Sequence, residues 1–268
     1  MLKTKTSNWV QELGIKRNGV IITDDFDSLM TYYLLKKKYP NLSIKGFYNF
    51  QSLWLQDNID DVDISVFVDC DCNIDRFKCI GNHKTINYSD NLNLNAFTTS
   101  DDYKEKFPFS TALTVLYLFY SKVEIDAMSD EFIKLLIAID SGHLGYFKDN
   151  GRWKTYHVDW LKKMDMSRVY EVLSNSSFEE FDNLIKSYRL NAKVKYNNQT
   201  YKFESDIDYF SLIFDFDIDL FEVFNDDFIF NYSTTYKRKN VKDYQLKDYS
   251  KIISLAETYK NQYSITYI

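Results

Sequence analysis

Two pairs of aspartates, each with one residue between its members, directly follow short apolar runs near the start of the chain. Asp25 and Asp27 come after GVIIT, and Asp69 and Asp71 come after ISVFV. Carboxylates at such turns can face one cleft, and hard divalent cations such as Mn²⁺ and Mg²⁺ prefer carboxylate oxygens. The pattern predicts a divalent-metal site. The alternatives are a solvated turn at residues 24–27 and a solvent-exposed side chain for one of the second pair, for which we choose Asp71.

Other polar residues that are candidates for metal or phosphate binding also follow apolar runs. His83 lies in CIGNHKT, in a chain with three histidines, and Asp140 follows LLIAI. Ser28 is expected to cap a helix whose N-terminus favours phosphate. His143 lies near Asp140 and is a candidate to face the same cleft, with a loop role as the alternative. We expect His157 at the surface.

The elements that would position these residues alternate between strand and helix patterns. Strands are expected at 19–23, 42–48, 64–68 and 78–80, and helices at 28–39, 109–123 and 130–139. This order predicts an α/β fold with a mostly parallel sheet flanked by helices. In such sheets ligands bind beyond the carboxyl ends of the strands, which is where both aspartate pairs fall.

The second half of the chain differs in character. Helical patterns at 158–163, 167–173 and 178–188 lead to a β-rich stretch with a turn signal at Asn197-Asn198, then to an expected helix at 248–259 and a final strand. We therefore expect a main domain over residues 1–160, a helical connector over 161–190 and a smaller α+β, β-rich domain over 191–268.

Composition limits the classes of function. The formal net charge is −6, whereas a protein that grips nucleic acid over its whole surface is usually basic. No stretch approaches the roughly 18 apolar residues of a membrane span, and the first residues lack the apolar core of a signal peptide. Three cysteines do not form a disulfide framework. We expect a cytoplasmic protein without membrane contact, and the aromatic share of 18% would suit a homo-oligomeric interface.

The order of the acidic and histidine motifs resembles that of the DHH phosphoesterases, which include single-strand-specific exonucleases, oligoribonucleases and cyclic-dinucleotide hydrolases. The family has an Asp-x-Asp motif, a strand-ending Asp, an Asp-His-His motif and a later Asp. Here the matching positions are Asp25 and Asp27, Asp69, Gly81-Asn82-His83, and Asp140. The resemblance covers residues 17–147, so residues 1–160 would form a DHH-like domain.

The resemblance implies two divalent ions, Mn²⁺ or Mg²⁺, that activate a water for attack on a phosphoester. Asp69 would bridge the ions and His83 would contact the phosphate, so that both act in catalysis. The substrate would be a nucleotide or a short single-stranded nucleic acid. The implied metal ligands are Asp25, Asp27, Asp69, Asn82 and Asp140.

The sequence departs from the family pattern at several positions. Asn82 stands in place of the motif's first histidine, Gly81 replaces its aspartate, and Ile21 lies where many members have a histidine. Asp24 is a candidate replacement carboxylate. A second interpretation therefore stays open: a degenerate DHH-like protein that binds a nucleotide or a protein partner without turnover.

Residues 228–268 resemble, more faintly, the family's substrate-binding domain in truncated form. Lys260-Asn261-Gln262 stands where that domain has a glycine-rich loop. A basic patch nearby supplies candidate phosphate contacts, with a solvated hairpin as the alternative. The patch comprises Lys237, Arg238, Lys239 and Lys242.

Two other patterns compete with this interpretation. Cys70, Cys72, Cys79 and His83 have a spacing that could hold Zn²⁺, although thiols at a buried strand end commonly act as small apolar fillers. Residues 212–221 (LIFDFDIDLF) look like the nucleophile strand of haloacid-dehalogenase-like phosphatases, but that strand belongs near the start of its fold.

Overall fold

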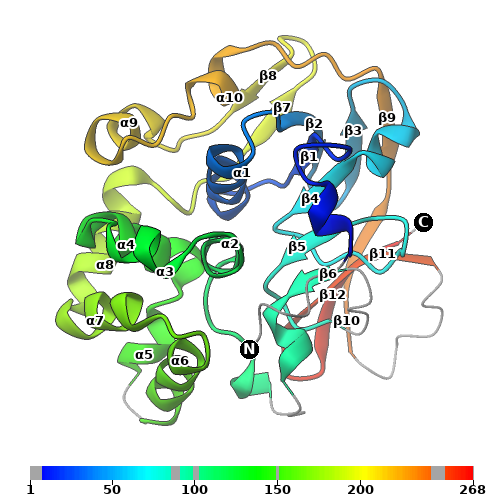
Figure 1. Cartoon of the computed structure of the whole chain (residues 1–268). Coiled ribbons are helices and arrows are strands. Elements are labelled where there is room, and N and C mark those ends of the chain that lie inside the picture. Colours follow the sequence, from blue (N-terminus) through cyan, green and yellow to red (C-terminus); the bar gives the residue numbers. More distant parts are fainter. Residues whose placement is uncertain (1–7, 86–90, 99–102, 149–150, 243–250, 268) are drawn as a thin grey trace.

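Short runs of β-branched and aromatic residues form a seven-stranded central sheet in the computed structural model, which describes residues 8–85, 91–98, 103–148, 151–242 and 251–267. The strand order is β6-β5-β4-β1-β2-β3-β9 (Figure 1). Strands β6 to β2 in this order run parallel, and β3 and β9 add an antiparallel edge. The bounds are β1 (Gly19–Ile22), β2 (Ser43–Tyr48), β3 (Ser52–Leu55), β4 (Ser65–Val68), β5 (Cys79–Gly81), β6 (Asn91–Asn93) and β9 (Tyr232–Thr235). The predicted α/β fold with a mostly parallel sheet is confirmed.

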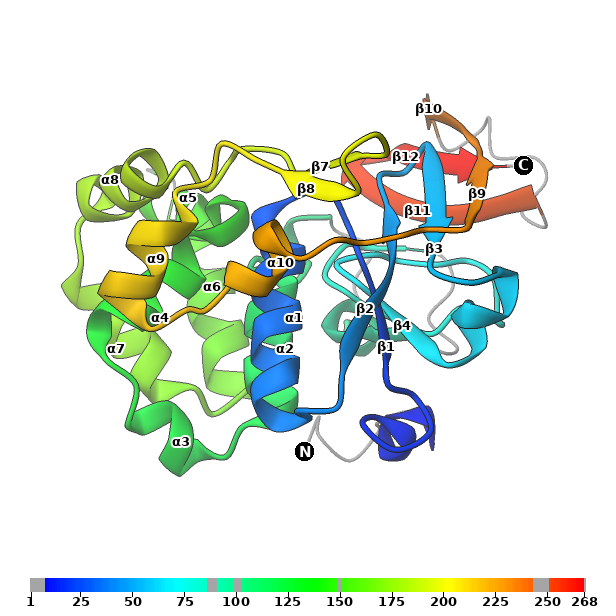
Figure 2. The same cartoon turned by 90° about the horizontal axis from the view of Figure 1, so that it is seen from above.

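The two faces of this sheet are covered by different elements. Because neighbouring side chains in a strand point to opposite faces, Val20 and Ile22 pack into one core and Ile21 into another. Helices α1 (Phe26–Lys38) and α2 (Thr111–Phe119) lie on the first face (Figure 2). The second core contains Ile253 of the C-terminal strands, which therefore cover part of the opposite face.

Further helices form a second layer outside α1 and α2 (Figure 1). They are α3 (Lys122–Asp126), α4 (Asp130–Ala138), α5 (Leu144–Phe147), α6 (Arg152–Lys163), α7 (Ser167–Asn175) and α8 (Phe178–Tyr188). The last three share one apolar core with α4, through buried side chains such as Leu161, Val172 and Phe181. Single 3₁₀ turns occur at Asn8–Glu12, Ile59–Asp63, Leu94–Phe97, Tyr103–Glu105 and Ile139–Ser141. No helix among the described residues has the length and apolar character needed to cross a membrane.

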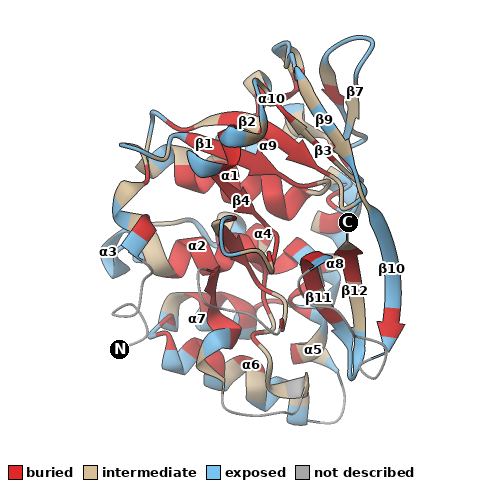
Figure 3. Cartoon of the chain, turned by 90° about the vertical axis from the view of Figure 1, so that its right-hand side faces the viewer, coloured by how far each residue is buried: buried red, intermediate tan, exposed pale blue. Residues whose placement is uncertain are grey.

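The C-terminal third combines a hairpin, two helices and a small sheet. The hairpin is β7 (Lys195–Asn197) and β8 (Lys202–Glu204), with Asn197 at the predicted turn accepting a hydrogen bond from the backbone of Gln199. Helices α9 (Tyr209–Phe216) and α10 (Phe221–Asn225) follow, and β10 (Lys237–Lys242), β12 (Gln262–Tyr267) and β11 (Ile252–Tyr259) form an antiparallel sheet in that order. Most of β10 is exposed (Figure 3).

One prediction for this part of the chain is wrong, and one competing pattern is excluded. Residues 252–259 form β11 and not a helix, because Ile252, Ile253 and Leu255 bury their side chains while the strand pairs with β12, and this tertiary pairing outweighs local propensity. Residues 248–250 of that predicted helix lie outside the described residues. The LIFDFDIDLF stretch at 212–221 belongs to α9, α10 and the loop between them, so it is not the strand that a haloacid-dehalogenase-like nucleophile requires.

Candidate metal centre

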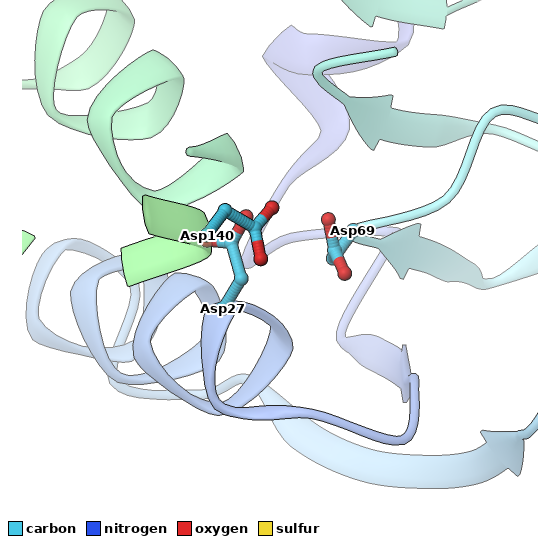
Figure 4. A group of neighbouring side chains, drawn as sticks. All are labelled: Asp27, Asp69 and Asp140. Carbon is cyan, nitrogen blue, oxygen red and sulfur yellow. The ribbon is translucent and has the colours of Figure 1, made fainter. Parts of the chain in front are cut away.

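Three aspartates from distant parts of the chain converge beyond the carboxyl ends of the parallel strands. Asp27 lies in the first turn of α1, Asp69 directly follows β4, and Asp140 lies in the turn after α4. One carboxylate oxygen from each lies within 4.8 Å of the others, and Figure 4 shows Asp27 and Asp140 on the helical side facing Asp69 on the strand side. We call these three residues the inner cluster. A divalent cation can bridge carboxylates at this spacing.

The backbone at two of these residues adopts a conformation that most side chains avoid. Asp69 has φ of 56° and Asp140 has φ of 53°, both in the left-handed region. Aspartate tolerates this region better than most residues, but the conformation still costs of the order of 1 kcal/mol. Such outliers concentrate at functional sites, and here each one turns a carboxylate into the inner cluster.

Asp27 is held by the start of helix α2. Its two oxygens accept hydrogen bonds from the backbone N–H groups of Thr111 and Ala112, at 2.7 and 2.8 Å. A negative charge is favourable at a helix N-terminus, so this contact ties α1 to α2. Oδ1 also accepts from the Thr31 hydroxyl at 3.5 Å, whereas Oδ2 keeps a lone pair free for a metal ion.

The hydrogen bonds that the inner cluster accepts do not offset the unfavourable free energy of its clustered negative charges. Asp69 accepts from the hydroxyls of Thr111 and Thr23, at 2.9 and 3.3 Å. Burial nevertheless raises the pKa values of Asp27 and Asp69 well above the ordinary value, and the charges of the neighbouring aspartates raise them further. Asp140 lies at the solvent-facing side; the atoms packed around its carboxylate and the charge of Asp25 raise its pKa as well. The cluster therefore favours the uptake of a proton or a cation.

Asp25 and Asp24 form an outer pair at the same edge of the sheet. Lys193, which directly precedes the hairpin, places its Nζ 3.1 Å from Asp24 Oδ1 and 3.2 Å from Asp25 Oδ2. Lys193 carries no local sequence signal, because a single lysine in an alternating stretch is ordinary, and its role depends on how a segment 168 residues further along the chain packs against β1.

Ser28 does not cap α1. Asp25 is the N-cap, and its Oδ1 accepts the Ser28 N–H at 3.3 Å. The Ser28 hydroxyl is fully buried; it accepts from the Thr23 N–H at 2.6 Å and donates to the Val68 carbonyl at 3.4 Å. This residue links β1 to β4 and does not line the cleft described below.

Asn82 lies beside the inner cluster. Its amide nitrogen donates to the Phe109 carbonyl at 3.0 Å and to Asp140 Oδ2 at 3.3 Å, which fixes the orientation because the reverse would face oxygen with oxygen. The amide oxygen is buried without a hydrogen-bond partner in the described structure. A buried amide oxygen without a partner, on a side chain that contacts Asp140, is a further metal-ligand candidate, since Mg²⁺ and Mn²⁺ sites accept carbonyl oxygens.

Asp71 is buried, so the prediction that it is solvent-exposed is wrong. Its carboxylate accepts from the His83 N–H at 3.1 Å and from the Asn93 amide at 2.5 Å, and lies 3.4 Å from His83 Nδ1. A Cβ atom added at Gly81 would lie only 2.4 Å from Asp71 Oδ1. The carboxylate of Asp71 therefore fills the space above Gly81, the position at which the DHH motif has its own aspartate, and it orients His83.

The other two histidines lie in the helical layer. His143 is buried and stacks on Phe181 with ring centroids 4.9 Å apart, and it does not line the cleft. His157 was expected at the surface, and that prediction is wrong: it is 2% exposed, with ring nitrogens 2.8 and 2.9 Å from the carbonyl oxygens of Trp153 and Gly142.

The three cysteines pack as apolar fillers. All are buried; the Sγ atoms of Cys70 and Cys72 are 3.6 Å apart, and burial raises the pKa values of Cys72 and Cys79, which favours the thiol form. His83 pairs with Asp71 and not with them. Within the described part of the chain, the inner cluster is the one group of acidic, histidine or cysteine side chains at metal-ligand spacing, so the Zn²⁺ alternative has no support.

A cleft of about 170 Å³ separates the acidic residues from the C-terminal sheet. Arg238 is the one member of the predicted basic patch that lines it; Lys237, Lys239 and Lys242 are exposed on β10. Arg238 stands 4.9 Å above the Phe50 ring and donates to the Ser264 hydroxyl at 3.1 Å. The other lining residues are Asp25, Asp69, Cys70, Asp71, His83, Asp140, Lys193, Ser254, Leu255, Ala256, Thr258 and Thr266. The wall opposite the carboxylates thus offers cations and hydroxyl groups to an anion.

Comparisons with protein-family models, with curated proteins and with solved structures gave no match. Function is therefore argued from the geometry and chemistry of the site, because a fold class alone does not specify an activity. The site offers clustered carboxylates with Lys193 at their edge, and Arg238 on the wall formed by the C-terminal sheet.

Proposed function

We propose that this protein is a divalent-metal-dependent phosphoesterase that acts on short single-stranded nucleic acid or small nucleotides. The observation that carries the proposal is the convergence of Asp27, Asp69 and Asp140 within 4.8 Å from three separate segments. Carboxylates at this spacing, two of which are buried, repel one another, and a divalent cation relieves that repulsion. A cytoplasmic location and a homo-oligomeric state stay predictions.

The donor set suits a hard cation such as Mn²⁺ or Mg²⁺. The inner cluster supplies carboxylate oxygens, and Asn82 supplies a buried amide oxygen that lacks a partner in the described structure. When bound, the metal would act as a Lewis acid that lowers the pKa of a water molecule and offsets charge on the phosphate.

Side chains that line the cleft account for phosphate binding and proton transfer. Lys193 and Arg238 line the cleft and would hold phosphate oxygens, since both are cationic and the cleft is otherwise acidic. His83 also lines it, and Asp71 fixes the imidazole in place through Nδ1. An imidazole oriented in this way can hydrogen-bond to a phosphate oxygen or move a proton.

A hydrolysis assay on the purified chain tests the proposal. We expect MnCl₂ to support cleavage of short single-stranded oligonucleotides or cyclic dinucleotides, and EDTA to abolish it. Asp69→Asn should lower the rate at least about 100-fold, because Asp69 belongs to the inner cluster. If Mn²⁺ binds and none of these substrates is cleaved, the protein is not this phosphoesterase.

One observation favours the alternative of a degenerate protein that binds a nucleotide or partner without turnover. Asn82 donates a hydrogen bond to Asp140, whereas a histidine at this position would offer a nitrogen ligand. If the wild-type chain binds Mn²⁺ without cleavage and Asn82→His creates activity, the degenerate interpretation holds. Activity in the wild type excludes it.

A further inference from the structure

The acidic residues of the site divide into two groups with different partners. In the inner cluster, Asp27, Asp69 and Asp140 approach one another without a cationic side chain bonded to any of them in the described structure. In the outer pair, Asp24 and Asp25 both contact the ammonium group of Lys193, at 3.1 and 3.2 Å. The resemblance to DHH phosphoesterases implies two metal ions, and the second would have to use the outer pair.

The outer pair has few free donors for a metal ion. One oxygen of Asp25 accepts the Ser28 N–H, and the other faces Lys193, as does Asp24 Oδ1. Ile21, at the position where many family members have a histidine ligand, is fully buried in the core of the opposite sheet face, so that ligand is absent here. Mn²⁺ and Mg²⁺ take about six ligands, so the donors fit one ion and not two.

The position of Lys193 is set by the backbone and not only by its flexible side chain. The next residue, Val194, donates its N–H to the Asp24 carbonyl at 2.8 Å, which fastens this segment to the turn after β1. The Lys193 Nζ lies 3.1 Å from Asp24 Oδ1 and 3.2 Å from Asp25 Oδ2, between the two carboxylates. The ammonium group is thus a fixed cation at the edge of the site.

We infer that the site takes a single divalent ion, on Asp27, Asp69 and Asp140, and that the Lys193 ammonium group stands on Asp24 and Asp25 where a second ion would otherwise bind. This inference rests on the proposed metal site and names its stoichiometry. Lys193 also lines the cleft. It therefore supplies to a bound phosphate the positive charge that a second metal would supply, without a metal's ability to activate water.

Metal stoichiometry tests the inference without an activity assay. The metal-free full chain is titrated with MnCl₂ by calorimetry, its manganese content is measured after gel filtration, and the bound ion is observed by electron paramagnetic resonance. We expect one Mn²⁺ per chain with the six-line spectrum of an isolated ion. Two ions per chain, or a spin-coupled pair, would overturn the inference and leave the proposed function standing. A failure to bind Mn²⁺ would remove both.

The variant Lys193→Met tests the role of the lysine. Its side chain is 55% exposed, so the substitution should leave the fold intact, as circular dichroism would check. Removing the ammonium group frees Asp24 and Asp25, and we expect a second Mn²⁺ to bind at least about tenfold more weakly than the first. The matched control is Lys195→Met, an exposed lysine two residues away on β7, which should stay at one ion. If Lys193→Met also stays at one ion, the lysine does not take the place of a metal.

Discussion

Two aspartates that follow the same strand, β4, line the same cleft, and their surroundings differ in kind. After β4, Asp69 meets Asp27 and Asp140 within 4.8 Å in the inner cluster. Two residues later Asp71 meets donors instead: the His83 N–H, the Asn93 amide and the His83 ring. Both carboxylates are buried, at 4% and 3% exposure, so burial does not distinguish them. The distinguishing feature is whether neighbouring groups donate to a carboxylate or repel it.

The comparison shows that hydrogen bonds alone do not stabilise the charged form of a buried carboxylate. Asp69 also accepts hydrogen bonds, from two threonine hydroxyls, yet its pKa is raised well above the ordinary value by burial and by the charges of Asp25, Asp27 and Asp140. Asp71 is satisfied in the folded chain as it stands, whereas an added cation would relieve the repulsion in the inner cluster. The first is a structural support, and the second is the proposed metal site.

The largest effect is expected where the structural support is broken by steric conflict. Gly81→Ala places a Cβ 2.4 Å from Asp71 Oδ1, and the carboxylate is held by His83 and Asn93, so it cannot move aside freely. We expect a loss of about 3 kcal/mol in the free energy of unfolding, measured by urea denaturation. The double variant Asp71→Ala with Gly81→Asp moves the carboxylate to the neighbouring strand and should recover at least half of this loss. Independent effects at the two positions would contradict the complementarity of Gly81 and Asp71.

The same substitution at the two aspartates should have opposite effects. Asp69→Asn removes a charge from the inner cluster and keeps a side chain that tolerates the left-handed backbone at this position. We expect the metal-free protein to gain about 1 kcal/mol of stability at pH 8. Asp71→Asn instead turns an NH₂ group toward one of the two donors, the His83 N–H or the Asn93 amide, and should lose about 2 kcal/mol. Thermal denaturation without metal measures both.

Added Mn²⁺ separates the two variants further. It should raise the melting temperature of the wild type and of Asp71→Asn but not of Asp69→Asn, because a ligand that binds only the folded state stabilises it by an amount that rises with the logarithm of its affinity. Equal losses in both variants without metal, or an unchanged Mn²⁺ response in Asp69→Asn, would show that the two aspartates have the same role.

The pH dependence of stability should carry a signature of the inner cluster. Because the pKa values of Asp27 and Asp69 are raised in the folded chain, the folded state holds more protons than the unfolded state above about pH 4. The free energy of unfolding of the metal-free protein should therefore fall as the pH rises from there through the raised pKa values, by up to about 1.4 kcal/mol per pH unit for each extra proton. Excess Mn²⁺ should remove this fall, and Asp69→Asn should make it shallower. Urea denaturation from pH 4 to 8 measures it, and a fall that persists unchanged with Mn²⁺ would count against a cation at the cluster.

The sequence predicted the parts of the fold and site that depend on local pattern. Apolar runs followed by aspartates placed Asp27 and Asp69 at strand ends, and parallel strands bring such ends to one edge. Asp140 was singled out by the motif order, although its carboxylate comes from the end of a helix and not of a strand. The short strands β3 and β6 were not predicted, since SLWL and NLN carry little signal by themselves.

The features that sequence could not predict depend on how distant segments pack. Lys193 reaches the outer pair because a segment far along the chain lies against the turn after β1. The relation between Gly81 and Asp71 is visible only in space. Gly81, in β5, lacks the motif's carboxylate, and Asp71, which follows the adjacent strand β4, places a carboxylate in the same space. A comparison of the motif position by position shows only that the aspartate is missing at residue 81. Burial of His157 between two carbonyl groups likewise needs the helical layer to be assembled.

The smallest effect is expected at His143, close to Asp140 in sequence but separate from both groups of aspartates. Its ring stacks on Phe181, its Nδ1 has no partner in the described structure, and burial lowers its pKa to about 4. A lowered pKa means that only the unfolded chain takes up this proton between about pH 6.5 and 4, so its contribution to stability is lost as the pH falls. His143→Phe should therefore change stability by less than about 1 kcal/mol at pH 7 and make that acid-side loss shallower by up to one proton. Urea denaturation between pH 7 and 4 measures it, with His157→Phe, which strands two carbonyl groups, as the more damaging control. Weaker Mn²⁺ binding in His143→Phe would place this histidine in the metal site after all.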